Sequence, residues 1–119
     1  MANALVLFDL PDRKVISNKC DHEGLRQIEM YKLEGNAVTN PSIHVSIHLG
    51  CANYGDEDEK IIFVADNSSI EDNDVKINLV TFDTLRVEYK SRLRTFTKLD
   101  RVLFPDSTLS LNVTYRELE

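Results

Sequence analysis

Apolar and polar residues alternate with a period of two along residues 42–49, and no other feature of the sequence constrains the fold as strongly. Successive side chains of a β-strand point to opposite faces, so this pattern predicts a strand with one buried face. Pro41 and Gly50 bound the segment, as turn residues do at the ends of strands. The apolar positions are Ile43, Val45, Ile47 and Leu49, and the polar positions are Ser42, His44, Ser46 and His48.

The same period recurs later in the chain, at residues 75–81, 85–89 and 109–115. Residues 60–65 and 4–10 instead form nearly continuous apolar runs, which suit strands covered on both faces. Six or seven short strands joined by turn-rich segments predict an all-β fold, either an antiparallel β-sandwich or a partly open barrel. The expected core residues are Val6, Phe8, Ile43, Val45, Ile47, Ile62, Val64, Ile77, Leu79, Val87, Leu109, Leu111 and Val113.

Residues 21–33 carry two conflicting signals. Asp21 is a good residue to begin a helix and Gly35 a good residue to end one, which favours a short helix. Ile28 and Met30 also fit the spacing of a strand. We therefore expect at most one short helix, and a β-rich α+β fold is the alternative class.

Length and composition indicate one domain spanning residues 1–119, with a net charge of −6 from 14 basic and 20 acidic residues. This charge argues against general affinity for polyanions and anionic membranes. The apolar run 4–8 is too short for a signal peptide, and no stretch approaches the roughly 20 residues of a membrane span. Cys20 and Cys51 are predicted to be free thiols in a reducing compartment. We expect a cytoplasmic protein that is neither secreted nor bound to a membrane.

Two histidines four residues apart, His44 and His48, resemble half of a zinc site. That geometry requires a helix, because a strand would separate the two side chains by roughly 13 Å. His22 lies two residues from Cys20, which supplies no more than half of a site. The sequence therefore predicts no metal site, and the two histidines are interpreted as polar residues of an outward face.

Acidic residues gather on both sides of the predicted strand 60–65. One run is Asp56, Glu57, Asp58 and Glu59, and the other is Glu71, Asp72 and Asp74. Calcium takes six to eight oxygen ligands from loops of this kind, so a calcium-binding β-sandwich is one alternative function. The two runs flank one strand, however, and are expected to lie at opposite ends of it, roughly 20 Å apart.

Basic residues are concentrated in a stripe near the C-terminal part of the chain. The stripe contains Arg86, Lys90, Arg92, Arg94, Lys98 and Arg101. If one strand continued through the segment, all but Arg101 would share a face with Phe96 and Glu88. Together with the acidic run 56–59, the stripe gives a segregated charge distribution that can orient a partner of complementary charge.

No pattern typical of an enzyme is present: no Gly-rich phosphate loop, no Gly-x-Ser-x-Gly elbow and no Cys-x-x-Cys pair. We therefore expect a non-enzymatic protein without a cofactor. The leading prediction is a protein–protein interaction or assembly module, either a subunit of a larger complex or a small protein that binds and blocks a partner. Its partner would be another protein or a second copy of itself. Its contact residues would be those of the basic stripe and the acidic run 56–59. The other alternative is single-stranded nucleic-acid binding through residues 86–101, with Phe96 as a stacking platform.

Overall fold

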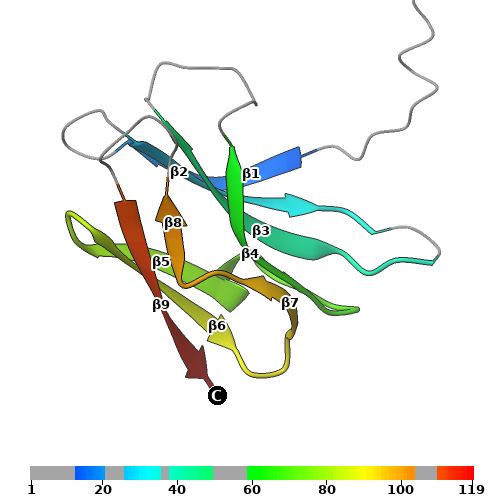
Figure 1. Cartoon of the computed structure of the whole chain (residues 1–119). Helices are drawn as coiled ribbons and strands as arrows, with labels where there is room; N and C mark the ends of the chain where they lie inside the picture. Colours follow the sequence, from blue (N-terminus) through cyan, green and yellow to red (C-terminus); the bar gives the residue numbers. More distant parts are fainter. Residues whose placement is uncertain (1–12, 21–25, 36–37, 50–58, 104–109) are drawn as a thin grey trace, which may run out of the picture.

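The computed structural model describes residues 13–20, 26–35, 38–49, 59–103 and 110–119, and within these ranges the chain forms nine strands in two packed sheets (Figure 1). The first sheet, here called sheet A, contains β1 (Arg13–Cys20), β2 (Arg26–Leu33), β3 (Ser42–Leu49), β4 (Lys60–Asp66) and β7 (Arg94–Lys98). The second, sheet B, contains β5 (Val75–Thr81), β6 (Thr84–Lys90), β8 (Arg101–Leu103) and β9 (Ser110–Leu118). One turn of 3-10 helix, η1 (Asp72–Asp74), precedes β5.

Sheet A is antiparallel throughout, in the order β1-β2-β3-β4-β7. Sheet B has the order β5-β6-β9-β8, and its central pair, β6 and β9, is parallel. The two sheets lie face to face without closing into a barrel (Figure 1). The predicted all-β sandwich is therefore confirmed.

A single cluster of buried apolar side chains fills the space between the sheets. It includes the predicted core residues Ile43, Val45, Ile47, Ile62, Val87, Leu111 and Val113. Ile77 and Leu79 are half-buried and pack against the cluster, whereas Val64 is half-buried and does not belong to it. Val6, Phe8 and Leu109 lie outside the described residues, as does the predicted strand 4–10.

The helix favoured for residues 21–33 is wrong for residues 26–33, which form β2. This strand pairs over its whole length with β3 and over most of it with β1. Ile28 and Met30 are buried in the core, and Tyr31 is buried on the opposite face. Pairing on both sides and burial of both faces outweigh the local helix signals, since tertiary context commonly overrides propensity.

The single strand assumed for the basic stripe is also wrong, because β6 ends at Lys90 and the chain passes to the other sheet. Ser91 N donates to Leu118 O and Leu93 N donates to Lys90 O, so a tight turn replaces the expected extended backbone. Leu93, between Arg92 and Arg94 in the sequence, is buried. Figure 1 shows the chain continuing from β6 into β7, which pairs with β4.

Cys20 is disulfide-bonded, so the prediction of a free thiol is wrong at this residue. Cys51, the only other cysteine of the sequence, lies outside the described residues. Over the described ranges the structure contains no α-helix, and hence no helix of the length and apolarity needed to cross a bilayer.

Candidate functional site

Three residues of the predicted stripe lie on the outward face of sheet B. Along β6 the buried residues Leu85, Val87 and Tyr89 face the core, so the alternating residues Arg86 and Lys90 face away from it. On β8, Arg101 is exposed beside the buried Val102.

Two further basic residues complete this surface. Lys76 of β5 and Arg116 of β9 are both exposed, and each pairs in register with Glu88 of β6. Glu88 is the one acidic residue that alternation places on this face of the described strands, and its Oε2 lies 3.6 Å from Nη1 of Arg116. The surface, called the basic face below, consists of Lys76, Arg86, Lys90, Arg101 and Arg116.

Arg92 and Arg94, by contrast, are engaged with buried carboxylates of their own domain. Arg92 Nη2 lies 2.5 Å from Oδ2 of Asp74, and Arg94 forms two contacts with Asp66, at 3.1 and 3.0 Å. Hydrogen bonding to Asp66 raises the pKa of Arg94. Arg92 is thus engaged with η1, and Arg94 is engaged with the neighbouring strand β4 of its own sheet.

Lys98 lies on β7 in sheet A, and its side chain is engaged with two tyrosines. Its Nζ donates a hydrogen bond to the Tyr89 hydroxyl at 3.1 Å and lies 5.3 Å from the centre of the Tyr115 ring. Phe96, the aromatic residue proposed for base stacking, lies on β7 in sheet A, with the Arg94 guanidinium 4.8 Å above its ring. The predicted stacking platform is therefore in a different sheet from the basic face.

Three described residues of the two acidic runs, Glu59, Asp72 and Asp74, are paired with basic side chains. In the second run Asp74 pairs with Arg92, and Asp72 Oδ1 lies 3.6 Å from Nζ of Lys32. In the first run Glu59 joins a cluster on sheet A, described next. Asp56, Glu57 and Asp58 lie outside the described residues.

The outward face of sheet A carries a cluster of ionisable side chains, called the His48 cluster below. It combines Arg13 of β1, Glu29 of β2, His48 of β3 and Glu59, which immediately precedes β4. His48 Nε2 lies 3.5 Å from Glu29 Oε1 and 3.8 Å from Glu59 Oε2. Arg13 Nη1 lies 3.2 Å from that Glu29 oxygen and 3.6 Å from that Glu59 oxygen.

The burial of this cluster is unusual for the outward face of a sandwich. The side chains of Glu29, His48 and Glu59 are only 11%, 9% and 12% exposed. Sequence reasoning missed the cluster because its members come from four separate segments of the chain. His48 finds its partners on neighbouring segments of sheet A, not in His44 of its own strand.

An aromatic stack adjoins the His48 cluster. The rings of Tyr31 and His44 lie 5.0 Å apart and nearly parallel, and the Arg13 guanidinium lies 3.8 Å above the Tyr31 ring. Burial, and then the positive charge of Arg13, lower the pKa of His44, whereas Glu59 opposes this shift. Burial raises the pKa of Tyr31. Both side chains are therefore neutral at pH 7.

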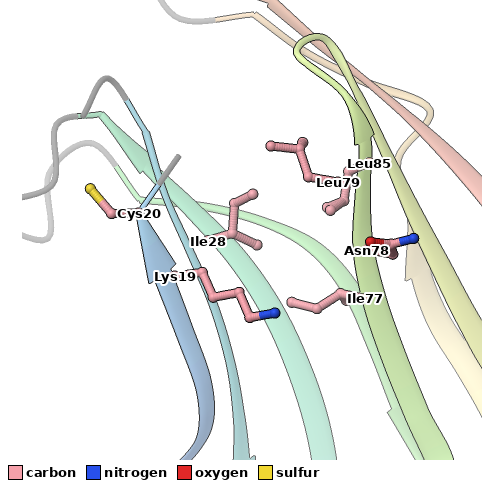
Figure 2. A pocket seen from close by; sticks show the side chains of 7 residues that line it. All are labelled: Lys19, Cys20, Ile28, Ile77, Asn78, Leu79 and Leu85. Atoms are coloured by element: carbon pink, nitrogen blue, oxygen red, sulfur yellow. The ribbon is translucent and has the colours of Figure 1, made fainter. Parts of the chain in front are cut away.

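Two hollows adjoin the sheets. Figure 2 shows an apolar cavity of about 90 Å³ between them, with Ile28 on one side and Ile77, Leu79 and Leu85 on the other. Typical small-molecule pockets measure roughly 300–1,000 Å³, so this cavity is a packing gap rather than a ligand site. A shallower hollow of about 460 Å³ on sheet A is lined by Leu33, Glu34, Val38, Thr39, Asn40, Ser42, His44, Val64, Asp66, Arg94 and Phe96.

Comparison of the chain with protein-family models, with curated proteins and with solved structures finds no match. The class of protein is therefore defined by the fold alone, an all-β sandwich with one mixed sheet.

Proposed function

We propose that the protein is a non-catalytic interaction module that binds an acidic protein surface through its basic face. The observation that carries the proposal is the accumulation of five basic side chains around one carboxylate on a single sheet face. The chain as a whole has a net charge of −6, so positive charge is segregated onto this face. Such segregation orients a partner of opposite charge and raises the rate of association.

The composition of the basic face favours an acidic protein over nucleic acid. Small polar residues share it, with Asn78 and Thr114 flanking Arg86 in register and Asn112 beside Arg101, while the exposed Leu103 is an apolar residue on the same side of β8 as Arg101. Alternation places no aromatic side chain on this face within the described strands. Proteins that bind single strands combine basic grooves with aromatic platforms. Arginine side chains recognise carboxylates and phosphates alike through paired hydrogen bonds, so it is the lack of an aromatic platform on the described part of this face that favours an acidic protein.

The cytoplasmic location predicted from the sequence is not part of this proposal. It depended partly on free thiols, and Cys20 is disulfide-bonded. Disulfides persist mainly in oxidising compartments, which favours an exported protein or an oxidising organelle.

The proposal is tested with a double charge-reversal variant, Arg86→Glu with Arg101→Glu. The matched control is Lys14→Glu with Lys19→Glu, which makes the same change of charge on exposed residues of β1 in sheet A. Polyglutamate serves as the acidic probe, and oligo(dT) serves as the nucleic-acid probe. We expect polyglutamate binding that weakens with salt, is lost in the basic-face variant and is retained in the control.

Absolute molar mass by light scattering at low and high salt accompanies these titrations. An oligomer that dissociates with salt and is absent in the basic-face variant identifies a second copy as the acidic partner. Tighter binding of oligo(dT) than of polyglutamate at equal ionic strength would replace the proposal by the nucleic-acid alternative. If the two charge-reversal variants bound each probe equally well, both the proposal and the nucleic-acid alternative would be overturned.

A further inference from the structure

We propose that the His48 cluster is a binding site for a divalent transition-metal ion of the zinc class, held by Glu29, His48 and Glu59 in competition with Arg13. These three side chains offer one nitrogen and two oxygen ligand atoms, all within 4.8 Å of one another. The proposal is independent of the basic face, which lies on the other sheet.

The spacing of the ligand atoms suits a small ion. Zinc binds imidazole nitrogen and carboxylate oxygen at roughly 2.0–2.2 Å, so neighbouring ligands of a tetrahedral ion lie roughly 3.4 Å apart. The distances from His48 Nε2 to the two carboxylate oxygens are 3.5 and 3.8 Å. Small side-chain adjustments would therefore bring all three atoms into coordination range. The Ser46 hydroxyl, also buried, lies 3.5 Å from the same nitrogen.

An unsatisfied buried carboxylate oxygen independently favours a cation at this cluster. Oε2 of Glu59 is buried and accepts no hydrogen bond. Its neighbours His48 and Arg13 lie at 3.8 and 3.6 Å, beyond hydrogen-bonding range. Buried carboxylate oxygens without a hydrogen bond are costly in proteins, and coordination of a cation is one way of satisfying them.

Arg13 balances the negative charge of the two glutamates in this structure. Its guanidinium lies between Glu29 and Glu59 and supplies the positive charge that both require. The Arg13 side chain is 39% exposed and belongs to β1, an edge strand, so it is the member of the cluster that can withdraw most easily. A metal ion that displaces Arg13 would exchange one positive charge for two beside the same carboxylates.

The nature of the ligands selects the kind of ion. Calcium and magnesium prefer sites made only of oxygen, and calcium takes six to eight ligands. One imidazole with two carboxylates instead suits zinc and its transition-metal neighbours, with water completing the coordination shell. Because Cys20 is disulfide-bonded, its sulfur does not compete as a thiolate ligand under non-reducing conditions.

The experiment is a calorimetric titration of the intact, non-reduced protein with Zn²⁺ at pH 7.5, repeated with Co²⁺ while its visible absorption is recorded. We expect one ion per chain. Arg13→Gln removes the competing charge without removing a ligand, and it should tighten binding at least roughly tenfold. His48→Gln removes a ligand and should weaken binding at least roughly 100-fold. His44→Gln is the matched control, since His44 lies on the same strand outside the cluster, and it should bind as the wild type does.

Arg13→Gln keeps the proposal falsifiable even if His48→Gln fails to fold, because a gain in affinity cannot result from unfolding. Absence of Zn²⁺ and Co²⁺ binding in both the wild type and Arg13→Gln at millimolar metal would overturn the proposal. It would equally be overturned if folded His48→Gln bound zinc as tightly as the wild type, or if Arg13→Gln left the affinity unchanged.

Discussion

Arg94 and Asp66 face each other across the β4–β7 pairing with two parallel contacts, Nε to Oδ1 at 3.1 Å and Nη2 to Oδ2 at 3.0 Å. The Asp66 side chain is only 10% exposed, whereas that of Arg94 is 67% exposed. The arginine therefore acts from the surface to satisfy a carboxylate that lies almost inside the protein. A substitution of Arg94 would therefore affect the stability of the fold as well as the charge of the stripe 86–101.

Charge reversal at Arg94 is expected to destabilise the fold rather than to test a contact surface. Arg94→Glu would place a second carboxylate against the buried Asp66, and a buried charge that loses its partner is costly. We expect a fall of several degrees in the midpoint of thermal unfolding, measured by circular dichroism. Arg101→Glu is the control, because Arg101 is exposed and no described residue forms an ion pair with it. Equal midpoints for the two variants would contradict this role of Arg94.

Tyr115→Phe is expected to weaken the junction between the sheets. The Tyr115 hydroxyl of β9 lies 2.6 Å from Leu99 O and 3.1 Å from Ile62 O of β4 in the opposite sheet. Loss of one such hydrogen bond should lower the free energy of unfolding by about 1 kcal/mol, as measured in urea. Tyr89→Phe should cost less, since the Tyr89 hydroxyl contacts the exposed Lys98. If Tyr89→Phe lost more unfolding free energy than Tyr115→Phe, the inter-sheet hydrogen bond of Tyr115 would not be the stronger of the two.

Gly35→Ala is expected to disturb the connection from β2 to β3. A Cβ atom at Gly35 would clash with Thr39 O and would lie 2.7 Å from both Asn40 C and Pro41 N. Backbone atoms cannot move aside as flexible side chains do, so overpacking should cost about 1–3 kcal/mol in chemical denaturation. Asn40→Ala, a nearby exposed position, provides the control. A fully stable Gly35→Ala protein would mean that the connection adopts another conformation.

Acidification should destabilise the protein partly through His44. Burial lowers the pKa of His44 in the folded state below the ordinary histidine value of about 6.5. Below about pH 6.5 the unfolded chain therefore binds a proton that the folded protein resists, and stability falls as the pH falls. We expect the loss of stability between pH 7 and pH 5 to be shallower in His44→Gln than in the wild type. Identical slopes in urea-unfolding experiments would rule out this contribution.

Reduction of the Cys20 disulfide should lower stability. Within a single chain Cys51 is the only available partner, and a loop of the length between them stabilises a fold by about 3–4 kcal/mol in the chain-entropy model. We expect dithiothreitol to lower the unfolding midpoint and the denatured, unreduced protein to contain no titratable thiol. Two free thiols in that assay would restore the expectation of a reducing compartment.

The strands that could be predicted from the sequence are those that alternate apolar and polar residues, together with the continuous apolar run that forms β4. β3, β5, β6 and β9 alternate clearly because each contributes every second residue to the core. β1 carries little alternation, since it is an edge strand with mostly exposed residues. Edge strands of this kind are identified by their pairing with a neighbouring strand, and a single sequence does not show that pairing.

The candidate sites were harder to predict because both are assembled across strands. The basic face unites Arg86 with Lys76 and Arg116, which lie on β5 and β9 and are brought together by register. The His48 cluster likewise requires the pairing of β1, β2 and β3 and the approach to β4. The stripe 86–101 was read as one strand because nothing local distinguishes the turn at Ser91 from extended backbone.

The parallel pairing of β6 and β9 has a consequence for how this protein acquires its structure during synthesis. β9 follows every other described strand in the sequence, yet it lies inside sheet B, between β6 and β8. Until β9 emerges from the ribosome, β6 and β8 have no neighbour to join them, and their unpaired edges and the apolar residues beneath them stay accessible. Sheet A can pair earlier, since all its strands precede β9. A nascent chain halted before residue 110 would therefore present half a sandwich, the form in which chaperones and proteases would first meet it.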